Sequence, residues 1–177
     1  MVKDFDSKIL IGIGNGNNGG GGLVAARRLA AWGYDVSVDI FTEINKDLSS
    51  KQLDRALTFG AKREAIANPD IWVDAYLGFS QKLPLRDNLI SRLQNANSIN
   101  CQRISLDIPT GFLGDTDVLY FQAHKVLSLA AAKKILYHLP TETELYIADL
   151  GIPKSVYEKF GVNIPPFQSD NILKIKK

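Results

Sequence analysis

Hydrophobic residues gather along the chain in short runs, each of a length that suits a β-strand. The first run, residues 8–14, is apolar, rich in β-branched residues and stopped by glycines, which predicts a buried strand. Similar runs predict five further strands at residues 35–41, 70–78, 102–111, 124–133 and 144–153. None of these runs reaches the roughly 18 apolar residues that a membrane-spanning helix needs.

Between the strands, apolar positions recur with helical spacing. Residues 22–33 predict a helix because Leu23, Ala26, Leu29 and Ala30 share one face. Further helices are predicted at residues 50–62 and 85–96, with a short one from about residue 155 before an irregular tail. Strands that alternate with helices are typical of βαβ units. We therefore expect one α/β domain over residues 1–177, with three layers and a mostly parallel sheet.

Nine consecutive glycines and asparagines, residues 14–22, separate the first strand from the first helix. A strand, a glycine loop and a helix can bring backbone N–H groups against a phosphate, which we expect near residues 22–23. The spacing Gly14-x-Gly16-x-x-Gly19 matches a dinucleotide fingerprint, although so glycine-rich a segment matches many patterns. The acid that usually follows the second strand is ambiguous between Asp39 and Glu43. A tight turn that only packs helix on strand remains the alternative.

Polar side chains mark three strand ends. Asn17 and Asn18 add amide groups to the glycine segment, Asp74 lies in an apolar strand, and Asp107 and Thr110 close another. Because the carboxyl ends of parallel strands share one edge of a sheet, these side chains are expected to meet there. Their oxygens suit a hard cation or a polar ligand. The alternative is that each Asp only caps the loop that follows it.

Composition and charge narrow the range of functions that the protein could have. A net charge of +2 gives no reason to expect nucleic acid as a partner, and the basic end "ILKIKK" is expected to be a solvated tail. The N-terminal segment mixes both charge signs and does not resemble a signal peptide. The single cysteine, Cys101, cannot form an internal disulfide, and it fits a cytoplasmic location. Two histidines cannot make a His-rich metal site.

Four motifs occur in an order that resembles the YjeF N-terminal domain family. These are the NAD(P)HX epimerases, called apolipoprotein A-I-binding protein in animals. The family's "GNNGGDGLVAARHL" is matched by "GNNGGGGLVAARRL", and its "DALLG" with a following "PLR" by "DAYLGFSQKLPLRD". Its "DIPSG" is matched by "DIPTG" and its "DIGIP" by "DLGIP". The motifs span residues 16–153, which makes the resemblance specific and nearly chain-wide.

The resemblance implies a Rossmann-like αβα sandwich that interconverts the R and S forms of hydrated NADH and NADPH. A partner dehydratase accepts only the S form, and a homodimer is possible. Asp107 would be the acid/base group, with Lys82 as a second catalytic candidate, while Lys133 is expected to be structural. A potassium ion would be held by Asn18, Asp74 and Thr110. Substrate would contact Asp107 and two segments: Asn17, Asn18, Gly19, Gly20, Gly21; and Gly78, Phe79, Ser80, Gln81, Lys82, Leu83, Pro84.

Two departures from the family pattern keep another function open. Gly21 stands where the family has an Asp, and only seven residues precede Lys8, where the family has a longer segment. A non-catalytic nucleotide-binding or scaffold module of the same fold is therefore the alternative. An ordinary NAD-dependent dehydrogenase is less favoured, because no catalytic set of His, Lys and Tyr is evident.

Overall fold

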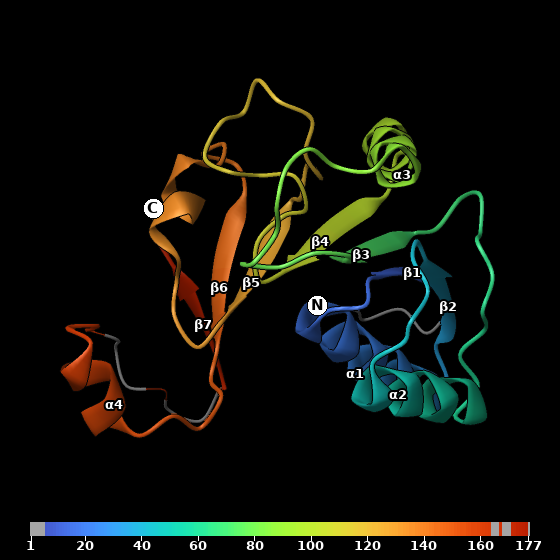
Figure 1. The fold of residues 1–177 in the computed structure, drawn as a ribbon, viewed down its shortest axis with the longest axis horizontal. Coiled ribbons are helices and arrows are strands. Elements are labelled where there is room, and N and C mark those ends of the chain that lie inside the picture. The colour runs from blue at the N-terminus through green and yellow to red at the C-terminus, as the bar shows by residue number, and fades with distance from the viewer. Residues whose placement is uncertain (1–5, 164–166, 168–170, 177) are drawn as a thin grey trace.

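The computed structural model describes residues 6–163, 167 and 171–176, and these residues form one seven-stranded sheet (Figure 1). The strand order is β2-β1-β3-β4-β5-β6-β7; only β7 is antiparallel to its neighbour. The strands are β1 (Lys8–Ile13), β2 (Asp35–Ile40), β3 (Ile71–Ala75), β4 (Gln102–Leu106), β5 (Lys125–Leu129), β6 (Glu144–Ala148) and β7 (Ile172–Ile175). The helices are α1 (Asn17–Ala31), α2 (Asp47–Thr58), α3 (Asp87–Ser98), the 3-10 helix η1 (Lys134–His138) and α4 (Lys154–Lys159).

Helices cover both faces of the sheet, which confirms the predicted αβα sandwich. Alternate residues of β1 point to opposite faces, as the pleat requires. Ile9 and Ile11 pack with α1 and α2, whereas Leu10 packs in the cluster that contains the apolar side of α3. Figure 1 shows α1 and α2 together on one face and α3 on the other. Among the described residues, no helix has the length and apolar character to cross a membrane.

Helix α1 begins five residues earlier than predicted, so the segment expected to be a glycine loop is mostly helix. Glycine has a low helix propensity, which made the sequence read as a loop. Packing explains the glycines instead: a Cβ at Gly19 would lie 1.9 Å from the carbonyl oxygen of Gly14. A Cβ at Gly22 would lie 2.6 Å from the Cβ of Ala75. The prediction that phosphate meets a helix N-terminus at residues 22–23 is therefore wrong, because that terminus lies at Gly16 and Asn17.

The later strands are shorter than predicted because the backbone turns at their carboxyl ends. The strand expected over residues 102–111 ends at Leu106, since Asp107 adopts a positive φ of 69°. The strand expected over residues 124–133 ends before Ala130, where φ is 64°. The strand expected over residues 144–153 ends at Ala148. Helix α2 lies about three residues before its predicted position, and α3 lies about two residues after.

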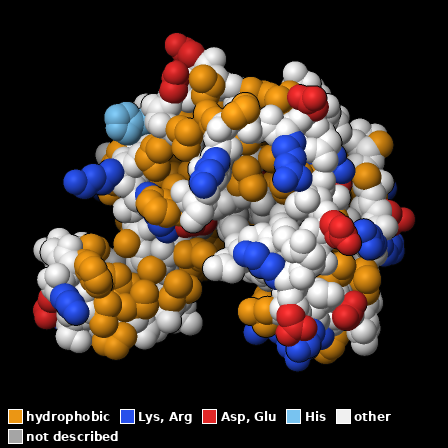
Figure 2. Space-filling model, in the orientation of Figure 1, with side chains coloured by type: hydrophobic (Ala, Val, Ile, Leu, Met, Phe, Trp, Pro, Cys, Tyr) orange, Lys and Arg blue, Asp and Glu red, His pale blue; other side chains and the backbone are white. Residues whose placement is uncertain are grey.

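The C-terminal segment contains a strand that the sequence did not predict. Strand β7 pairs with β6, and Lys174 donates to Glu144 over 2.6 Å, so this basic end is not wholly a solvated tail. Its four residues alternate between exposed and half-buried, a pattern too short to signal a strand. The "IPP" segment lies outside the described residues. Helix α4, predicted from about residue 155, stands apart from the sheet, and Figure 2 shows hydrophobic side chains gathered there.

Candidate functional site

Several of the predicted site residues line a cavity at the carboxyl ends of β1, β3 and β4. Strand β1 lies between β2 and β3, and α1 covers one face of the sheet while the segment after β3 leads to α3 on the other. This is the kind of topological switch point at which open α/β sheets bind ligands. The cavity has a volume of about 420 Å³ and is lined by Gly16, Asn17, Asn18, Lys46, Tyr76, Leu77, Gly78, Phe79, Ser80, Gln81, Asp107 and Leu129.

Asn18 ties the first turn of α1 to two strand ends. Its Nδ2 donates to the carbonyl oxygens of Leu77, over 2.6 Å, and of Leu106, over 3.1 Å. These two bonds use both amide protons and leave Oδ1 buried without a hydrogen-bond partner among the described residues. An orphaned buried carbonyl oxygen is costly. Asn18 Oδ1 is therefore well placed to accept a hydrogen bond from a ligand or to coordinate a cation.

Asp74 and Thr110 form a buried polar cluster beside this junction. The Oδ1 of Asp74 accepts from Thr110 Oγ1 over 2.7 Å and from the N–H of Tyr76. Its Oδ2 accepts from Ser105 Oγ and from the N–H of Thr110. Burial raises the pKa of Asp74 to about 6, although these hydrogen bonds act to lower it. The sequence-based expectation that Asp74 and Thr110 meet is confirmed, and Leu77 links them to Asn18 by donating its N–H to Thr110 Oγ1.

Asp107 is held in a strained conformation at the cavity. Its positive φ is rare for a residue other than glycine, and such strain is often found at functional sites. Oδ2 accepts from the N–H of Phe79 over 2.9 Å. A Cβ at Gly78 would come within 3.2 Å of the same oxygen, so Gly78 permits this close approach. Asp107 thus caps the loop after β3, and not the loop that follows its own strand as one alternative held, while its carboxylate also lines the cavity.

Lys133 forms an ion pair with Asp107. Its Nζ lies 2.5 Å from Asp107 Oδ1 and also donates to the carbonyl oxygen of Leu129 and to Ser128 Oγ. Both side chains of the pair are largely buried, so water screens the charges only weakly. Sequence reasoning assigned Lys133 a structural role and missed this contact. The signal available was a lysine that directly follows three alanines at the end of a predicted strand.

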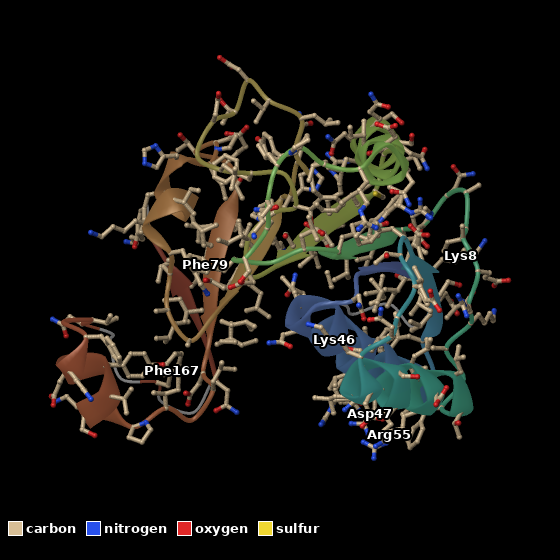
Figure 3. The ribbon with its side chains drawn as sticks, in the orientation of Figure 1. Lys8, Lys46, Asp47, Arg55, Phe79 and Phe167 are labelled. Atoms are coloured by element: carbon tan, nitrogen blue, oxygen red, sulfur yellow. The ribbon has the colours of Figure 1, made fainter. Side chains whose placement is uncertain are left out.

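The segment from Gly78 to Pro84 divides its side chains between two tasks. Phe79 and Ser80 line the cavity, and Figure 3 shows Phe79 on the loop after β3, opposite Lys46 at the start of α2. Gln81 also lines the cavity and holds the loop in place, because its amide exchanges hydrogen bonds with the backbone of Gly111, Pro109 and Phe112. Leu83 is exposed and does not line this cavity.

The glycine segment contributes less to the cavity wall than expected. Gly16 and Asn17 line it, whereas Gly19, Gly20 and Gly21 do not. Gly19 is buried by helix packing, and Gly21 is exposed, with nothing within 4 Å of a Cβ placed there. A side chain at position 21 would therefore fit without a clash.

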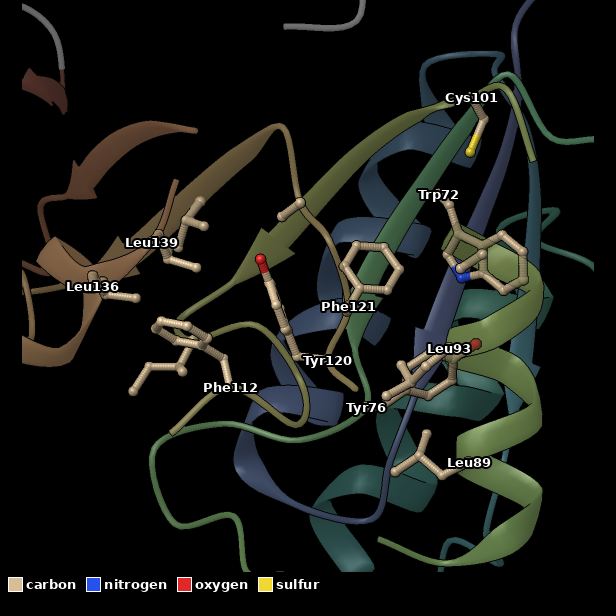
Figure 4. Packing of buried hydrophobic residues seen from close by; sticks show 14 of the residues in the cluster. Trp72, Tyr76, Leu89, Leu93, Cys101, Phe112, Tyr120, Phe121, Leu136 and Leu139 are labelled. Carbon is tan, nitrogen blue, oxygen red and sulfur yellow. The ribbon is translucent and has the colours of Figure 1, made fainter. Parts of the chain in front are cut away.

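Asp39 is buried and does not line this cavity. Its Oδ2 accepts from the hydroxyl of Tyr76 over 2.6 Å and from Nε of Arg92 over 2.7 Å. Tyr76 belongs to the cluster on the α3 side, with Leu89 and Leu93 (Figure 4). Desolvation by burial, with the charge of Asp39 next, raises the pKa of Tyr76 well above its usual range. Asp39 is thus part of the buried structure.

A second cavity, also of about 420 Å³, adjoins the first. The two share Gly16, Lys46, Leu77, Ser80 and Gln81 in their walls. Lys82, the second catalytic candidate, lines this cavity and not the one that contains Asp107, and Arg86 and Pro84 lie there too. No group of three or more His, Cys, Asp or Glu side chains suited to a metal ion occurs in the described part of the chain.

Comparison with known proteins identifies relatives of the whole chain. A family model described as YjeF-related protein N-terminus matches residues 2–135. A protein named NAD(P)H-hydrate epimerase from Plasmodium knowlesi is 35% identical over 95% of this chain, and the match covers 61% of that protein. One of the same name from Anopheles darlingi is 31% identical over 94% of this chain and 77% of its own length. The crystal structure of yeast ynu0, YNL200c, superposes with a TM-score of 0.85 at 24% identity, over 97% of this chain and 78% of that chain.

Proposed function

The chain belongs to the family of YjeF-related protein N-termini, and from this premise we propose that it is an isomerase that epimerises hydrated NADH and NADPH. The observation that carries the proposal is the Asp107–Lys133 pair at the wall of a cavity of suitable size. Relatives named NAD(P)H-hydrate epimerase support it, although the chain spans only 61% of the length of the two Plasmodium relatives.

The chemistry requires a group that moves a proton in both directions. Inversion at C6 of the nicotinamide ring begins when the C6–O bond breaks and the hydroxyl leaves as water, which consumes one proton. Water then adds to the other face of the ring iminium and releases one proton. In this ion pair Asp107 is a carboxylate, so the first proton would come from the ammonium of Lys133 through Asp107, and the pair would recover a proton when water adds, which returns it to its initial state. The N–H of Phe79 and the ammonium of Lys133 fix both carboxylate oxygens in place.

A potassium ion is part of the proposal. Asn18 would offer its unpartnered Oδ1, and the buried carboxylate of Asp74 with the hydroxyl of Thr110 would complete an all-oxygen set. The ion would supply positive charge next to the cavity and offset the cost of a buried carboxylate. The residues present fit such an ion, since an amide oxygen and a carboxylate are hard donors.

Thermal unfolding tests the potassium site. Potassium at ten times its dissociation constant stabilises by about 1.4 kcal/mol, which is roughly 3–6 °C in Tm for a chain of this size. We expect potassium chloride to raise Tm by this amount relative to choline chloride. Asn18→Leu should remove the difference, while Asn17→Leu should keep it. An equal Tm of the wild-type protein in both salts would exclude the site.

The proposed partners follow from the reaction. The substrate is the small molecule NAD(P)HX, and the S form would pass to a dehydratase that accepts only that epimer. A homodimer and a cytoplasmic location belong to the same proposal. Sedimentation of the purified chain over a range of concentrations tests the dimer.

A non-catalytic nucleotide-binding or scaffold module remains the second candidate, favoured by one observation. Gly21, just after the first turn of α1, stands where the family has an Asp, so this part of the helix carries no carboxylate. The deciding experiment incubates the chain with R-NADHX and potassium, and detects the product with an S-specific dehydratase. Turnover well above the spontaneous rate supports the enzyme. If only Gly21→Asp restores turnover, the chain is a decayed epimerase; the open space at Gly21 makes that variant compatible with the fold.

A further inference from the structure

We propose that the second cavity binds a phosphomonoester on the adenosine ribose, so that the chain prefers hydrated NADPH to hydrated NADH. This inference rests on the proposed function and extends it to the choice of substrate. Hydrated NADPH differs from hydrated NADH by one 2′-phosphate, which adds between one and two negative charges at neutral pH. A pocket that tells the two apart must therefore hold unpaired positive charge.

The cavity carries that charge. Lys46, Lys82 and Arg86 line it, and its lining includes no Asp or Glu. Within the described part of the chain, none of these three side chains forms an ion pair. The three cations thus line one cavity without a counter-ion in its wall, and a bound phosphate would supply the opposite charge.

Hydrogen bonds hold the backbone of Lys46 and the side chain of Arg86 in place. The Asn15 side chain exchanges hydrogen bonds with Asn45 and accepts the backbone N–H of Lys46, which holds the start of α2 beside the glycine segment. Arg86 lies just before α3, and its Nη1 approaches Thr42 Oγ1 at 3.5 Å. Arginine suits this task because its planar fork of donors matches phosphate oxygens. The hydroxyls of Thr42 and Ser80 add donors to the same wall.

Because the two cavities adjoin, the nicotinamide end of the dinucleotide can occupy one and the adenosine end the other. Each cavity alone, at about 420 Å³, lies near the lower end of the range for drug-sized ligands, so a dinucleotide needs both. With the nicotinamide ring at Asp107, the molecule extends past Gly16, which borders both cavities. The N-terminus of α1 at Gly16 then serves the pyrophosphate through its backbone N–H groups. The three cations beyond it remain for a further phosphate.

Binding of adenosine fragments tests the inference without any epimerase assay. We expect adenosine 2′,5′-bisphosphate to bind at least ten times more tightly than 5′-AMP by calorimetry at low salt. Arg86→Met and Lys82→Met should each reduce that preference by about three-fold or more. Lys51→Met is the matched control, because Lys51 is an exposed lysine of α2 that pairs with Asp47 outside both cavities, and it should change nothing.

The outcomes separate the inference from the proposed function. Equal affinity for the two fragments, or an equal loss for both in the Arg86 variant, overturns the inference, because the cavity would then bind the pyrophosphate or no phosphate at all. A preference for the bisphosphate without epimerisation supports the inference and refutes only the proposed function. Where epimerisation is found, Arg86→Met should lower kcat/KM at least ten-fold more for hydrated NADPH than for hydrated NADH.

Discussion

Lys133 is the residue whose role depends most on the three-dimensional structure. Its ammonium forms an ion pair with Asp107, which follows β4, and donates a hydrogen bond to the carbonyl oxygen of Leu129, which ends β5. Lys133 therefore connects the carboxyl ends of these two strands. The positive charge of Lys133 balances the negative charge of the largely buried Asp107 carboxylate. Removal of one partner of such a pair leaves a buried charge unpaired, which is costly.

We therefore expect Lys133→Met to lower kcat by about 10²-fold or more, the range for loss of a proton-transfer group. Lys133→Arg should recover part of the rate, because it restores the positive charge. Lys134→Met is the control, since Lys134 is the exposed neighbour in η1. Steady-state kinetics check the result, and an unchanged kcat in Lys133→Met would show that Lys133 only packs the fold.

His124 makes stability depend on pH. Burial, with the charges of Arg103 and Lys125 next, lowers the pKa of His124 from 6.5. The folded protein therefore binds this proton less readily than the unfolded chain does, and the free energy of unfolding decreases as pH falls through 6.5. The loss stops below the lowered pKa, where both states are protonated.

Urea unfolding at pH 7.5 and pH 5.5 measures this effect. We expect wild-type protein to lose more stability between these pH values than His124→Gln does, and His138→Gln to behave like wild type. A comparison with the variant is needed because Asp74, whose pKa is about 6, changes stability in the opposite direction over part of this range. An equal loss in wild type and His124→Gln would refute the prediction.

At the scale of elements, helix α1 shows that neighbouring glycines serve different purposes. Gly22 faces the sheet, where a Cβ would lie 2.6 Å from the Cβ of Ala75 and 2.8 Å from Cδ1 of Ile13. Gly21 faces solvent and has nothing within 4 Å. We expect Gly22→Ala to destabilise by about 1–3 kcal/mol through overpacking. Gly21→Ala should instead stabilise by about 0.5–1 kcal/mol through helix propensity.

Chemical denaturation of both variants measures the free energy of unfolding and so tests whether packing against the sheet requires glycine at position 22. If the two substitutions change the free energy of unfolding equally, helix–sheet packing does not explain Gly22. Gly16→Ala can serve as a further control, because a Cβ at Gly16 would meet nothing within 4 Å and Gly16 does not pack against Ala75 of β3.

The elements also show what a single sequence can and cannot reveal. Six of the strands and the mostly parallel sheet were predictable because apolar runs such as residues 8–14 are strong, local signals. The start of α1 was not, since local propensity opposes a glycine-rich helix, and the close contacts of Gly19 and Gly22 that explain the glycines are visible only in the structure. Strand β7 was missed because four half-exposed residues carry too little pattern. The meeting of Asp74 and Thr110 followed from topology, whereas the Asp107–Lys133 pair required the positions of two loops.

At the scale of the whole molecule, the described residues gather a largely buried ion pair, an unpartnered amide oxygen and a cationic cavity along a single edge of the sheet. Together they suit a substrate with a reactive ring at one end and phosphates at the other. The proposed epimerase mechanism therefore depends on Asp107 as the group that transfers the proton to and from the substrate.

Epimerisation of R-NADHX by the Asp107→Asn variant, in potassium buffer, tests that claim most directly. Asparagine tolerates the positive φ and can still accept from the N–H of Phe79, so the fold should survive with an unchanged circular dichroism spectrum. It cannot exchange a proton at neutral pH, and we expect the rate to fall by about 10²–10⁴ relative to an active wild type. A variant that epimerises within a few-fold of wild type would contradict the account, because Asp107 would then only hold the loop after β3.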